Sequence, residues 1–403
     1  MKITVKSEAL QVLASTGAVF TSAKGNSPIS RNARLTTEGN ALILRATNGA
    51  VSLYMRIGAR VEEPGDLLVS LDMMNGLEFT ESAIQLHTDG KSQLVLTDGT
   101  FRVRVPVAAA DVFPDIAWFE GEGCEVDVKA LKAHLDPLFE IVDPKAEDIS
   151  GAVRLVFVRQ TSNEGLLLTA TDKNTIGSTM VKASVPLSLV GDATLRARIA
   201  IVPARHLKSV LDKLPNEGAV KIGLKGESLQ MSDGVSRTFT LQLMALGYPN
   251  LGELESRLRF ITKAVLPVTP VTKRLMGIRR VVDVKAANIL TLIPGAAEPA
   301  TPATLHWHLS DKDGTQADDQ FPVAYDGSGP IRLGVGFQYL APILKSLDDL
   351  GVTNAEIHIG PAEEKSQGDT PFTLHPIKIA ATAGRETHQI AFIVALVNIA
   401  AKP

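Results

Sequence analysis

Three segments with one pattern recur along the chain: VSLDMMNGL at residues 69–77, VPARHLKSVL at 202–211 and VGFQYLAPIL at 335–344. Each begins with a valine that ends a strand-like run, and apolar residues then follow at helical spacing. The starting valines lie 133 residues apart in both steps, from 69 to 202 and from 202 to 335. An equal period of this length predicts three copies of one structural unit.

A turn marks the same period further along each copy. Asp98-Gly99 returns 135 residues later as Asp233-Gly234. The matching turn of the third copy, Ala383-Gly384, comes 150 residues after that. The longer spacing indicates an insertion in the third copy, and the polar, turn-rich segment 361–375 is the candidate.

Length and composition agree with several soluble domains. A chain of 403 residues exceeds the size of a single hydrophobic core, and its composition of 45% hydrophobic and 21% charged residues is typical of globular proteins. The single cysteine excludes an internal disulfide and a multi-cysteine zinc site. No signal peptide or membrane span is expected, because Met1–Lys6 alternates polar and apolar residues and the apolar segment 390–401 is short. We therefore expect a cytoplasmic protein with domains at 1–121, 122–258 and 259–403.

Local signals predict an α+β fold. In the first copy, Lys2–Lys6 is a predicted strand and Ser7–Phe20 a predicted helix with Ser7 as its N-cap. Asn48-Gly49 is a hairpin turn that joins strands at 41–46 and 51–57. Repeated three times, this order gives tandem domains that each contain antiparallel sheets and two helices.

Motifs for catalysis or cofactor binding are absent. The sequence has no phosphate-binding loop, G-x-S-x-G or H-E-x-x-H. Gly334-Val335-Gly336 is better explained as a tight strand-to-helix turn, and 311–314 as a solvated turn than as a calcium loop. His306 and His308 alternate as on an exposed strand face, and Cys124 has no identifiable activating histidine. We predict a non-catalytic protein without a metal or cofactor.

Basic residues recur on the predicted helices. Lys129 and Lys132, and likewise Arg205 and Lys208, stand three residues apart and share a helical face. Lys273 and Arg274 lie on a third helix. Any single pair is typical of a solvated face, but stacked helices would merge them into a surface that contacts phosphates without reading bases. The net charge of −3 argues against tight wrapping of nucleic acid.

The sequence resembles the bacterial sliding clamp, the beta subunit of DNA polymerase III. The resemblance rests on motifs whose order and spacing run through the whole chain. They are Met1-Lys2-Ile3-Thr4-Val5 continuing to Asn32, Phe113-Pro114, Ala170-Thr171-Asp172, Ile201-Val202-Pro203, Tyr248-Pro249-Asn250 and Ala391-Phe392-Ile393-Val394.

The resemblance implies a head-to-tail homodimeric ring that encircles duplex DNA and gives a DNA polymerase processivity. The polymerase, the clamp loader and repair proteins would dock through short linear motifs between the second and third domains. The residues implied for this docking pocket are Thr171, Lys173, Asn174, Ile176, Pro249, Leu254, Ile393 and Ala395. Lys24 would face DNA together with the helical basic residues. Phe101 and Val103 would lie near one dimer edge, and Leu275 and Met276 near the other.

Departures from the family pattern cluster at this docking pocket. Lys173-Asn174-Thr175-Ile176 replaces G-H-R-L, and Glu253 stands where an arginine is usual. We therefore expect a weaker or shifted preference for partner peptides. Two alternatives stay open: the apolar pocket residues form plain interdomain core, or the chain is a clamp-fold scaffold or decoy that does not load on DNA.

Overall fold

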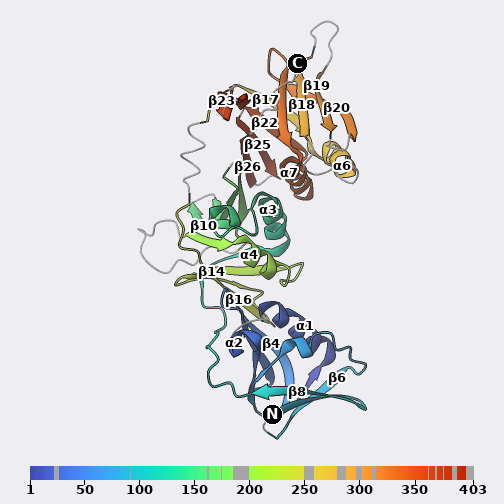
Figure 1. Cartoon of the computed structure of the whole chain (residues 1–403), viewed down its shortest axis with the longest axis vertical. Helices are drawn as coiled ribbons and strands as arrows, with labels where there is room; N and C mark the ends of the chain where they lie inside the picture. Colours follow the sequence, from blue (N-terminus) through green and yellow to red (C-terminus); the bar gives the residue numbers. More distant parts are fainter. Residues whose placement is uncertain are drawn as a thin grey trace. The chain divides into compact units, whose positions relative to one another are not determined.

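The computed structural model describes residues 1–21, 27–90, 92–160, 163–173, 175–184, 199–248, 258–278, 287–295, 302–310, 315–361, 363–367, 370–374, 376–383 and 388–395 (Figure 1). Contacts divide the chain into two compact units. Unit 1 contains residues 1–128, 184–194 and 206–244; unit 2 contains 129–183, 195–205 and 245–403. Each unit is built on one twelve-stranded sheet. The boundary between the units passes through the second expected domain, so the three-domain limits stay a prediction.

The sheet of unit 1 is antiparallel and has the order β1-β6-β7-β8-β5-β2-β3-β4-β16-β15-β14-β9. Its strands are β1 (Lys2–Lys6), β2 (Ala33–Glu38), β3 (Ala41–Thr47), β4 (Val51–Glu63), β5 (Asp66–Val69), β6 (Ala83–Asp89), β7 (Gln93–Asp98), β8 (Phe101–Ala108), β9 (Glu122–Asp127), β14 (Ala219–Lys225), β15 (Ser228–Ser232) and β16 (Arg237–Gln242). The helices are α1 (Ser7–Gly17), α2 (Pro28–Arg31) and α4 (Ala204–Leu211), with short 3-10 turns η1 (Ala18–Phe20) and η2 (Leu71–Met73).

The sheet of unit 2 has the order β13-β10-β11-β12-β26-β25-β22-β17-β20-β19-β18-β21. Its strands are β10 (Ala152–Gln160), β11 (Asn163–Thr171), β12 (Thr175–Lys182), β13 (Ile199–Pro203), β17 (Thr262–Pro267), β18 (Ala287–Ile293), β19 (Ala303–Ser310), β20 (Gln316–Tyr325), β21 (Ile331–Gly336), β22 (Asn354–Ile359), β25 (Pro376–Ala383) and β26 (His388–Ala395). The helices are α3 (Val128–Ile141), α6 (Val268–Ile278) and α7 (Phe337–Asp349), and η3 (Ile149–Gly151) precedes β10. β23 (Glu363–Gln367) and β24 (Thr370–Leu374) pair with each other in a small sheet of their own, inside the predicted insertion.

The pairing pattern reproduces the sequence repeat. Val69 pairs with Ala33 between β5 and β2, and Val202 pairs with Val153 between β13 and β10. Because the two valines are equivalent in the repeat, Ala33 and Val153 are equivalent as well. Following the pairings from strand to strand assigns residues of β2–β5 their equivalents in β10–β13.

The predicted helix at 69–77 is wrong. Only the 3-10 turn Leu71–Met73 forms there, and Gly76 then takes a φ of 99° that ends any helical continuation. The corresponding segments of the other repeats do form the helices α4 and α7. Within the described residues, the first repeat therefore lacks the helix that corresponds to α4 and α7.

Helix α1 starts where the sequence predicted, although Ser7 is its first residue and not its N-cap. The cap position is Lys6, which makes no capping hydrogen bond through its side chain, and the Ser7 amide donates to the Ser82 carbonyl oxygen at 3.1 Å. The bond to the Ser82 carbonyl satisfies an amide that a helix start otherwise leaves unpaired. The hairpin at Asn48-Gly49 and the strand Lys2–Lys6 form as predicted.

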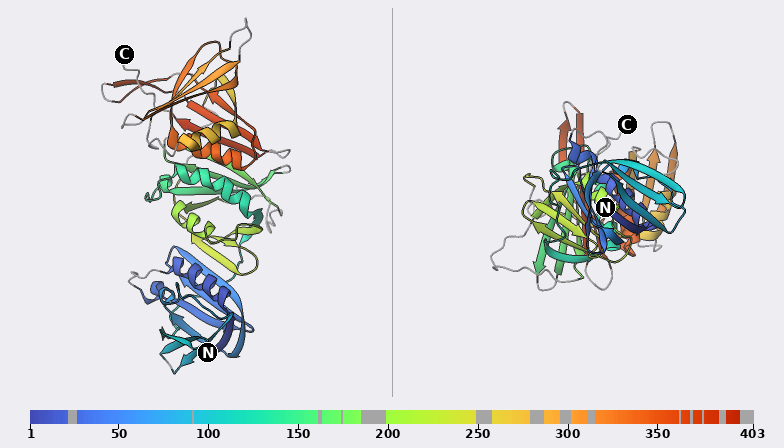
Figure 2. Two further views of the ribbon diagram at one scale, coloured as in Figure 1. Left: turned by 90° about the vertical axis from the view of Figure 1, so that its right-hand side faces the viewer. Right: turned by 90° about the horizontal axis from the view of Figure 1, so that it is seen from below.

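In unit 2, α6 and α7 lie side by side (Figures 1 and 2). The Thr272 hydroxyl donates to the Leu344 carbonyl oxygen at 3.1 Å, and the Thr269 hydroxyl donates to Asp348 at 2.5 Å. These bonds satisfy polar groups within an apolar helix contact, so they fix how the two helices are aligned.

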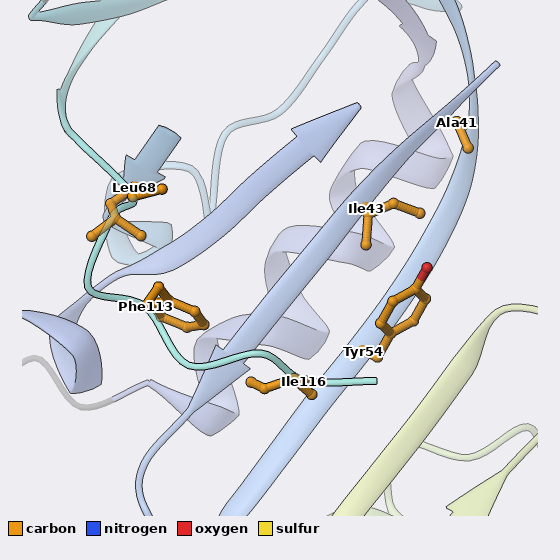
Figure 3. Packing of buried hydrophobic residues seen from close by; sticks show 7 residues of the cluster. Ala41, Ile43, Tyr54, Leu68, Phe113 and Ile116 are labelled. Carbon is orange, nitrogen blue, oxygen red and sulfur yellow. The ribbon is translucent and has the colours of Figure 1, made fainter. Parts of the chain in front are cut away.

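A cluster of buried side chains closes one face of the first repeat. Its members are Ala41, Ile43, Tyr54, Leu68, Ala110, Phe113 and Ile116, with Ile29 and Trp118 packed against it. Figure 3 shows Phe113 and Ile116, from the segment after β8, lying over the strands that carry Ile43 and Tyr54. The Arg45 side chain donates to the Ile116 carbonyl oxygen at 3.1 Å and thereby ties this covering segment to β3.

Replacing Phe113 by alanine should destabilise unit 1 by about 3 kcal/mol, because the ring is 6% exposed and its removal leaves a cavity. Unfolding in urea, followed by the fluorescence of Trp118 in a Trp307→Phe background, measures the change. Val112→Ala is the matched control, since Val112 is 70% exposed and its truncation should cost less than about 0.5 kcal/mol. Equal effects of the two substitutions would contradict the packing described here.

Candidate functional site

The strands β10, β11 and β12 of the second repeat have two different faces. One face is covered by α3: Leu155 and Leu168 are buried there, and the His134 ring on α3 lies 2.5 Å from the Thr179 hydroxyl on β12. Because side chains alternate along a strand, the neighbouring residues point to the opposite side. That opposite side, named the outer face below, comprises Arg154, Val156, Leu167, Thr169, Thr171, Ile176, Ser178 and Met180.

The outer face is only partly covered. Arg154, Leu167, Ile176, Ser178 and Met180 are half-buried, which sets them apart from the fully buried residues on the side of α3. A sheet face that leaves apolar side chains accessible next to a cation suits the binding of an amphipathic ligand.

Comparison with the first repeat shows why this face is open. The register makes Ser178 equivalent to Tyr54 and Thr169 equivalent to Arg45. Tyr54 and Arg45 are large, and Tyr54 belongs to the buried cluster of Figure 3. The smaller serine leaves its position on the face half-buried, whereas Thr169 is 0% exposed, so the face is accessible at Ser178 and closed at Thr169.

Tyr248 is the main aromatic group on the outer face. Its hydroxyl donates to the Thr169 carbonyl oxygen at 3.4 Å, and the Arg154 guanidinium carbon lies 5.8 Å from the centre of its ring. Burial raises the pKa of Tyr248 and lowers the pKa of Arg154, since both ionised forms lose hydration. A phenol and a guanidinium held this way can recognise polar groups of a ligand.

The turn after β11 carries the predicted residues Thr171 and Lys173. Thr171 is 2% exposed, and its hydroxyl accepts a hydrogen bond from the Lys173 amide at 2.9 Å, so it shapes the turn and offers little surface. Lys173 has a φ of 78°, the only positive φ of a non-glycine residue in the described part of the chain. Its ammonium group lies 2.6 Å from Asp148.

The hydrogen bond from Lys173, together with those from Ser150, holds the pKa of Asp148 well below its ordinary value. Because the pKa of Asp148 is lower in the folded state, the pair stabilises the fold at pH values above the pKa that the carboxyl has in the unfolded chain. This contribution falls as the pH drops through the lowered value. The pair thus supports a turn that the backbone alone disfavours.

Other predicted docking residues are only partly placed. Ile393 pairs with Ile176 and Ala395 pairs with Pro376 in the backbone register of β26, so Ile393 is adjacent to the outer face in the same sheet. Asn174, Pro249 and Leu254 lie outside the described residues, as does the predicted DNA-facing residue Lys24. Sequence reasoning missed Arg154 and Thr169, and only the strand register shows that Arg154 corresponds to Arg34.

The predicted basic residues lie on solvent-facing parts of three helices. Lys129, Arg205, Lys208, Lys273 and Arg274 are exposed and Lys132 is half-buried. The exposed face of α3 also carries Asp136 and Glu140, so its charge is mixed. Arg274 lies 3.6 Å from Asp319 on β20. These side chains can contact phosphates without forming a strongly basic surface.

Of the predicted dimer-edge residues, three are accessible. Phe101 is 54% exposed, and Val103 and Met276 are half-buried. Leu275 is 1% exposed and packs in the core beneath α6, so its side chain cannot reach a second copy. The expected position of Leu275 near a dimer edge stays a prediction.

Among the described residues, the minor sequence motifs do not assemble into a reactive site, and the segment 311–314 lies outside the described ranges. Burial raises the pKa of the Cys124 thiol to about 12, which keeps it protonated and unreactive. His308 lies 2.6 Å from Asp318 on the neighbouring strand, and the described residues contain no group of three metal-ligating side chains. No helix within the described ranges is long and apolar enough to cross a membrane.

The backbone strain at Lys173 can be measured. Lys173→Gly should be more stable than Lys173→Ala by about 1 kcal/mol, because both lose the Asp148 contact but only alanine keeps a Cβ in the left-handed region. Urea unfolding curves of the two variants test this. The same pair of substitutions at Asp172, where φ is not positive, should show the reverse order. An alanine variant as stable as the glycine variant would show that the turn carries no strain.

Comparison with known proteins addresses the fold. Residues 1–117 match the family described as DNA polymerase III beta subunit, N-terminal domain. No curated protein sequence matches the chain. Among solved structures, the sliding clamp of Bacillus subtilis is similar with a TM-score of 0.79 at 14% identity, covering 99% of both chains.

Two further structures agree. The clamp of Caulobacter crescentus gives a TM-score of 0.76 at 16% identity, and that of Pseudomonas aeruginosa bound to griselimycin gives 0.75 at 16%; each match covers 99% of this chain and 100% of the other. The resemblance read from the sequence is therefore confirmed: the N-terminal segment matches the DNA polymerase III beta subunit family, and the whole chain has the fold of bacterial sliding clamps.

Proposed function

We propose that this chain is the protomer of a sliding clamp. Two copies close into a ring around duplex DNA, and the ring carries partner proteins that dock through short peptide segments. Such a protein holds DNA by enclosure and needs no catalytic site. The observation that carries this proposal is a strand pairing between neighbouring repeats that occurs twice within the chain. It leaves one unpaired strand edge in the first repeat and a matching unpaired strand edge in the third.

In both sheets, the fourth strand of one repeat pairs with the eighth strand of the next. β4 pairs with β16 through Val51–Met55 and Arg237–Leu241. β12 pairs with β26 through Thr175–Thr179 and Ile390–Val394. Two strands have no such partner in the described part of the chain: the eighth strand of the first repeat, β8, and the fourth strand of the third repeat, β20.

Both remaining strands have a long unpaired edge among the described residues. β8 pairs with β7 up to Pro106 and with β5 only at Val107 and Ala108. β20 pairs with β19 along its length and with β17 only at Ala324 and Tyr325. Unpaired edges are templates for another strand. Pairing of β20 in one copy with β8 in a second, and the reciprocal contact, closes a two-membered ring.

The register also predicts which side chains meet in this contact. Thr238 lies opposite Tyr54 in the β16–β4 pair. In β8, Arg102 is equivalent to Thr238 of β16. In β20, Asp318 is equivalent to Tyr54 of β4. Both Arg102 and Asp318 are exposed. Opposite charges placed directly across two strands favour this pairing.

Charge reversal tests the contact. Arg102→Asp or Asp318→Arg puts like charges opposite each other, which should cost about 1 kcal/mol of binding free energy at each interface. Because the ring has two interfaces, the dimer Kd should rise about 30-fold. The double variant Arg102→Asp/Asp318→Arg should recover the wild-type Kd in sedimentation equilibrium. Arg104→Asp is the matched control, because the register places Arg104 opposite the uncharged Gln316. A monomeric wild-type protein at micromolar concentration, or no recovery in the double variant, would reject the pairing.

Enclosure explains how an acidic protein keeps hold of DNA. The net charge of −3 and the mixed charge on α3 disfavour tight binding, yet a ring is retained by topology. Exposed cations on α3 and α4 then only need to make loose, sequence-independent phosphate contacts.

DNA retention can be tested without a loading machine. The protein threads onto linear duplex DNA with biotin at both ends, and streptavidin then blocks the ends. Wild-type protein should stay on blocked DNA and leave unblocked DNA. Lys132→Glu/Arg205→Glu/Lys208→Glu should lower the trapped fraction at least tenfold, whereas Lys2→Glu/Lys221→Glu/Lys225→Glu, an equal charge change on strands, should not. Wild-type protein that is never trapped would favour a scaffold that does not hold DNA.

The outer face of the second repeat is the proposed docking site for partner peptides. Its half-buried Leu167, Ile176 and Met180 can accept apolar side chains, and Tyr248 and Arg154 can orient a peptide. The griselimycin complex of the Pseudomonas aeruginosa clamp supports a ligand-binding role for proteins of this fold.

A further inference from the structure

We infer that the proposed ring contact responds to pH and that the imidazole of His308 is its sensor. When His308 gains a proton, the attraction between Asp318 of one copy and Arg102 of the second copy weakens. This inference rests on the proposed function, because it uses the pairing of β20 with β8, and it adds a condition under which the ring opens.

His308 and Asp318 form a direct cross-strand pair. They lie opposite each other in the register of β19 and β20, which are neighbouring strands of the sheet of unit 2 (Figure 1). The Nδ1 atom of His308 lies 2.6 Å from a carboxylate oxygen of Asp318, so the two side chains share one face of the sheet. The imidazole keeps 39% of its surface exposed and the carboxylate 72%. Solvent protons therefore reach the imidazole, and a second copy can reach the carboxylate.

The proposed ring contact adds a third member to this row. Pairing of β20 with β8 of a second copy puts Arg102 of that copy opposite Asp318, on the side of β20 that β19 does not occupy. Side chains directly opposite one another lie on the same face of a sheet. The carboxylate of Asp318 then stands between the imidazole of its own chain and the guanidinium of the other.

Apart from Asp318, the register surrounds His308 with residues that are uncharged or basic. From β18, β19, β20 and β8 of the second copy, these neighbours are Ile289, His306, Gln316, Gln320 and Arg104. Asp319, the second carboxylate of β20, belongs to the opposite face and lies 3.6 Å from Arg274. Within the described ranges, Asp318 is therefore the one carboxylate that His308 and Arg102 share.

Protonation of His308 changes the charge balance of this row. A neutral imidazole donates one hydrogen bond to the carboxylate and leaves its negative charge for Arg102. An imidazolium neutralises that charge and stands two strands, or about 10 Å, from the guanidinium, so the two cations also repel each other. Closure of the ring then releases protons, and by linkage the dimer is favoured at high pH and weakened as the pH falls. Histidine is the side chain that ordinarily changes charge between about pH 8 and about pH 5.

Sedimentation equilibrium of the full-length chain at low salt, from about pH 8 to about pH 5.5, tests the inference. The dimer Kd should rise about fivefold as the pH falls, because neutralising Asp318 removes roughly half of the effect of reversing its charge. In His308→Gln, the Kd should stay at its high-pH value throughout. His306→Gln is the matched control, since it removes a histidine from the same strand that lies opposite the uncharged Gln320. It should keep the pH dependence of the wild-type protein.

Two further variants identify the row as the cause. His308→Lys fixes a positive charge beside Asp318, so at high pH it should already show the weak Kd that the wild-type protein reaches at low pH. Arg102→Gln should remove the pH dependence, because the row then lacks its guanidinium. A wild-type Kd that does not rise as the pH falls, or a rise that persists in His308→Gln, overturns the sensor but leaves the ring contact intact. A chain that is monomeric at every pH rejects the ring contact and the sensor with it.

Discussion

Backbone hydrogen bonding between the fourth strand of one repeat and the eighth strand of the next is the interaction on which the rest of the structure depends. An isolated repeat would expose unpaired strand edges, and the neighbouring repeat covers them. This pairing adds β16, β15, β14 and β9 to the sheet of the first repeat, and β10–β13 to the sheet of the third. The second repeat is thereby shared between two sheets. That explains why the compact units do not follow the sequence period, although the period is real.

Local structure was predictable wherever a short signal decides it. Asn48-Gly49 specifies a tight hairpin, and alternation specifies Lys2–Lys6, so both were found from sequence. The helix expected at 69–77 does not form, because the prediction relied on apolar spacing and neglected Gly76. The positive φ of Gly76 ends the helical segment after one turn. Spacing predicted an insertion in the third copy and polar composition suggested 361–375 as its place, but neither indicated the hairpin of β23 and β24.

Functional residues were predictable to a smaller extent, because they depend on contacts between distant strands. Resemblance pointed to Thr171 and Lys173, and the structure gives both a role in shaping the turn. Arg154 and Thr169 carry no local signal, since an arginine and a threonine on a strand are ordinary residues. Their proximity is evident only from the strand register, which pairs Arg154 with Thr169 and makes Arg154 equivalent to Arg34. Leu275, expected near a dimer edge by analogy, is buried in the single chain, and its sequence context did not indicate this burial.

The two repeats show how one backbone supports different roles through side-chain size and charge. In the first repeat, Arg45, Tyr54 and Phe113 close the sheet face, and Arg34 is neutralised within the chain by Asp66. In the second, Ser178 leaves part of the face accessible, and Ile199 stands in the position of Asp66, so Arg154 packs against the ring of Tyr248 instead of a carboxylate. Such a face costs stability in the free protein, because a desolvated cation and an unpaired hydroxyl are both unfavourable.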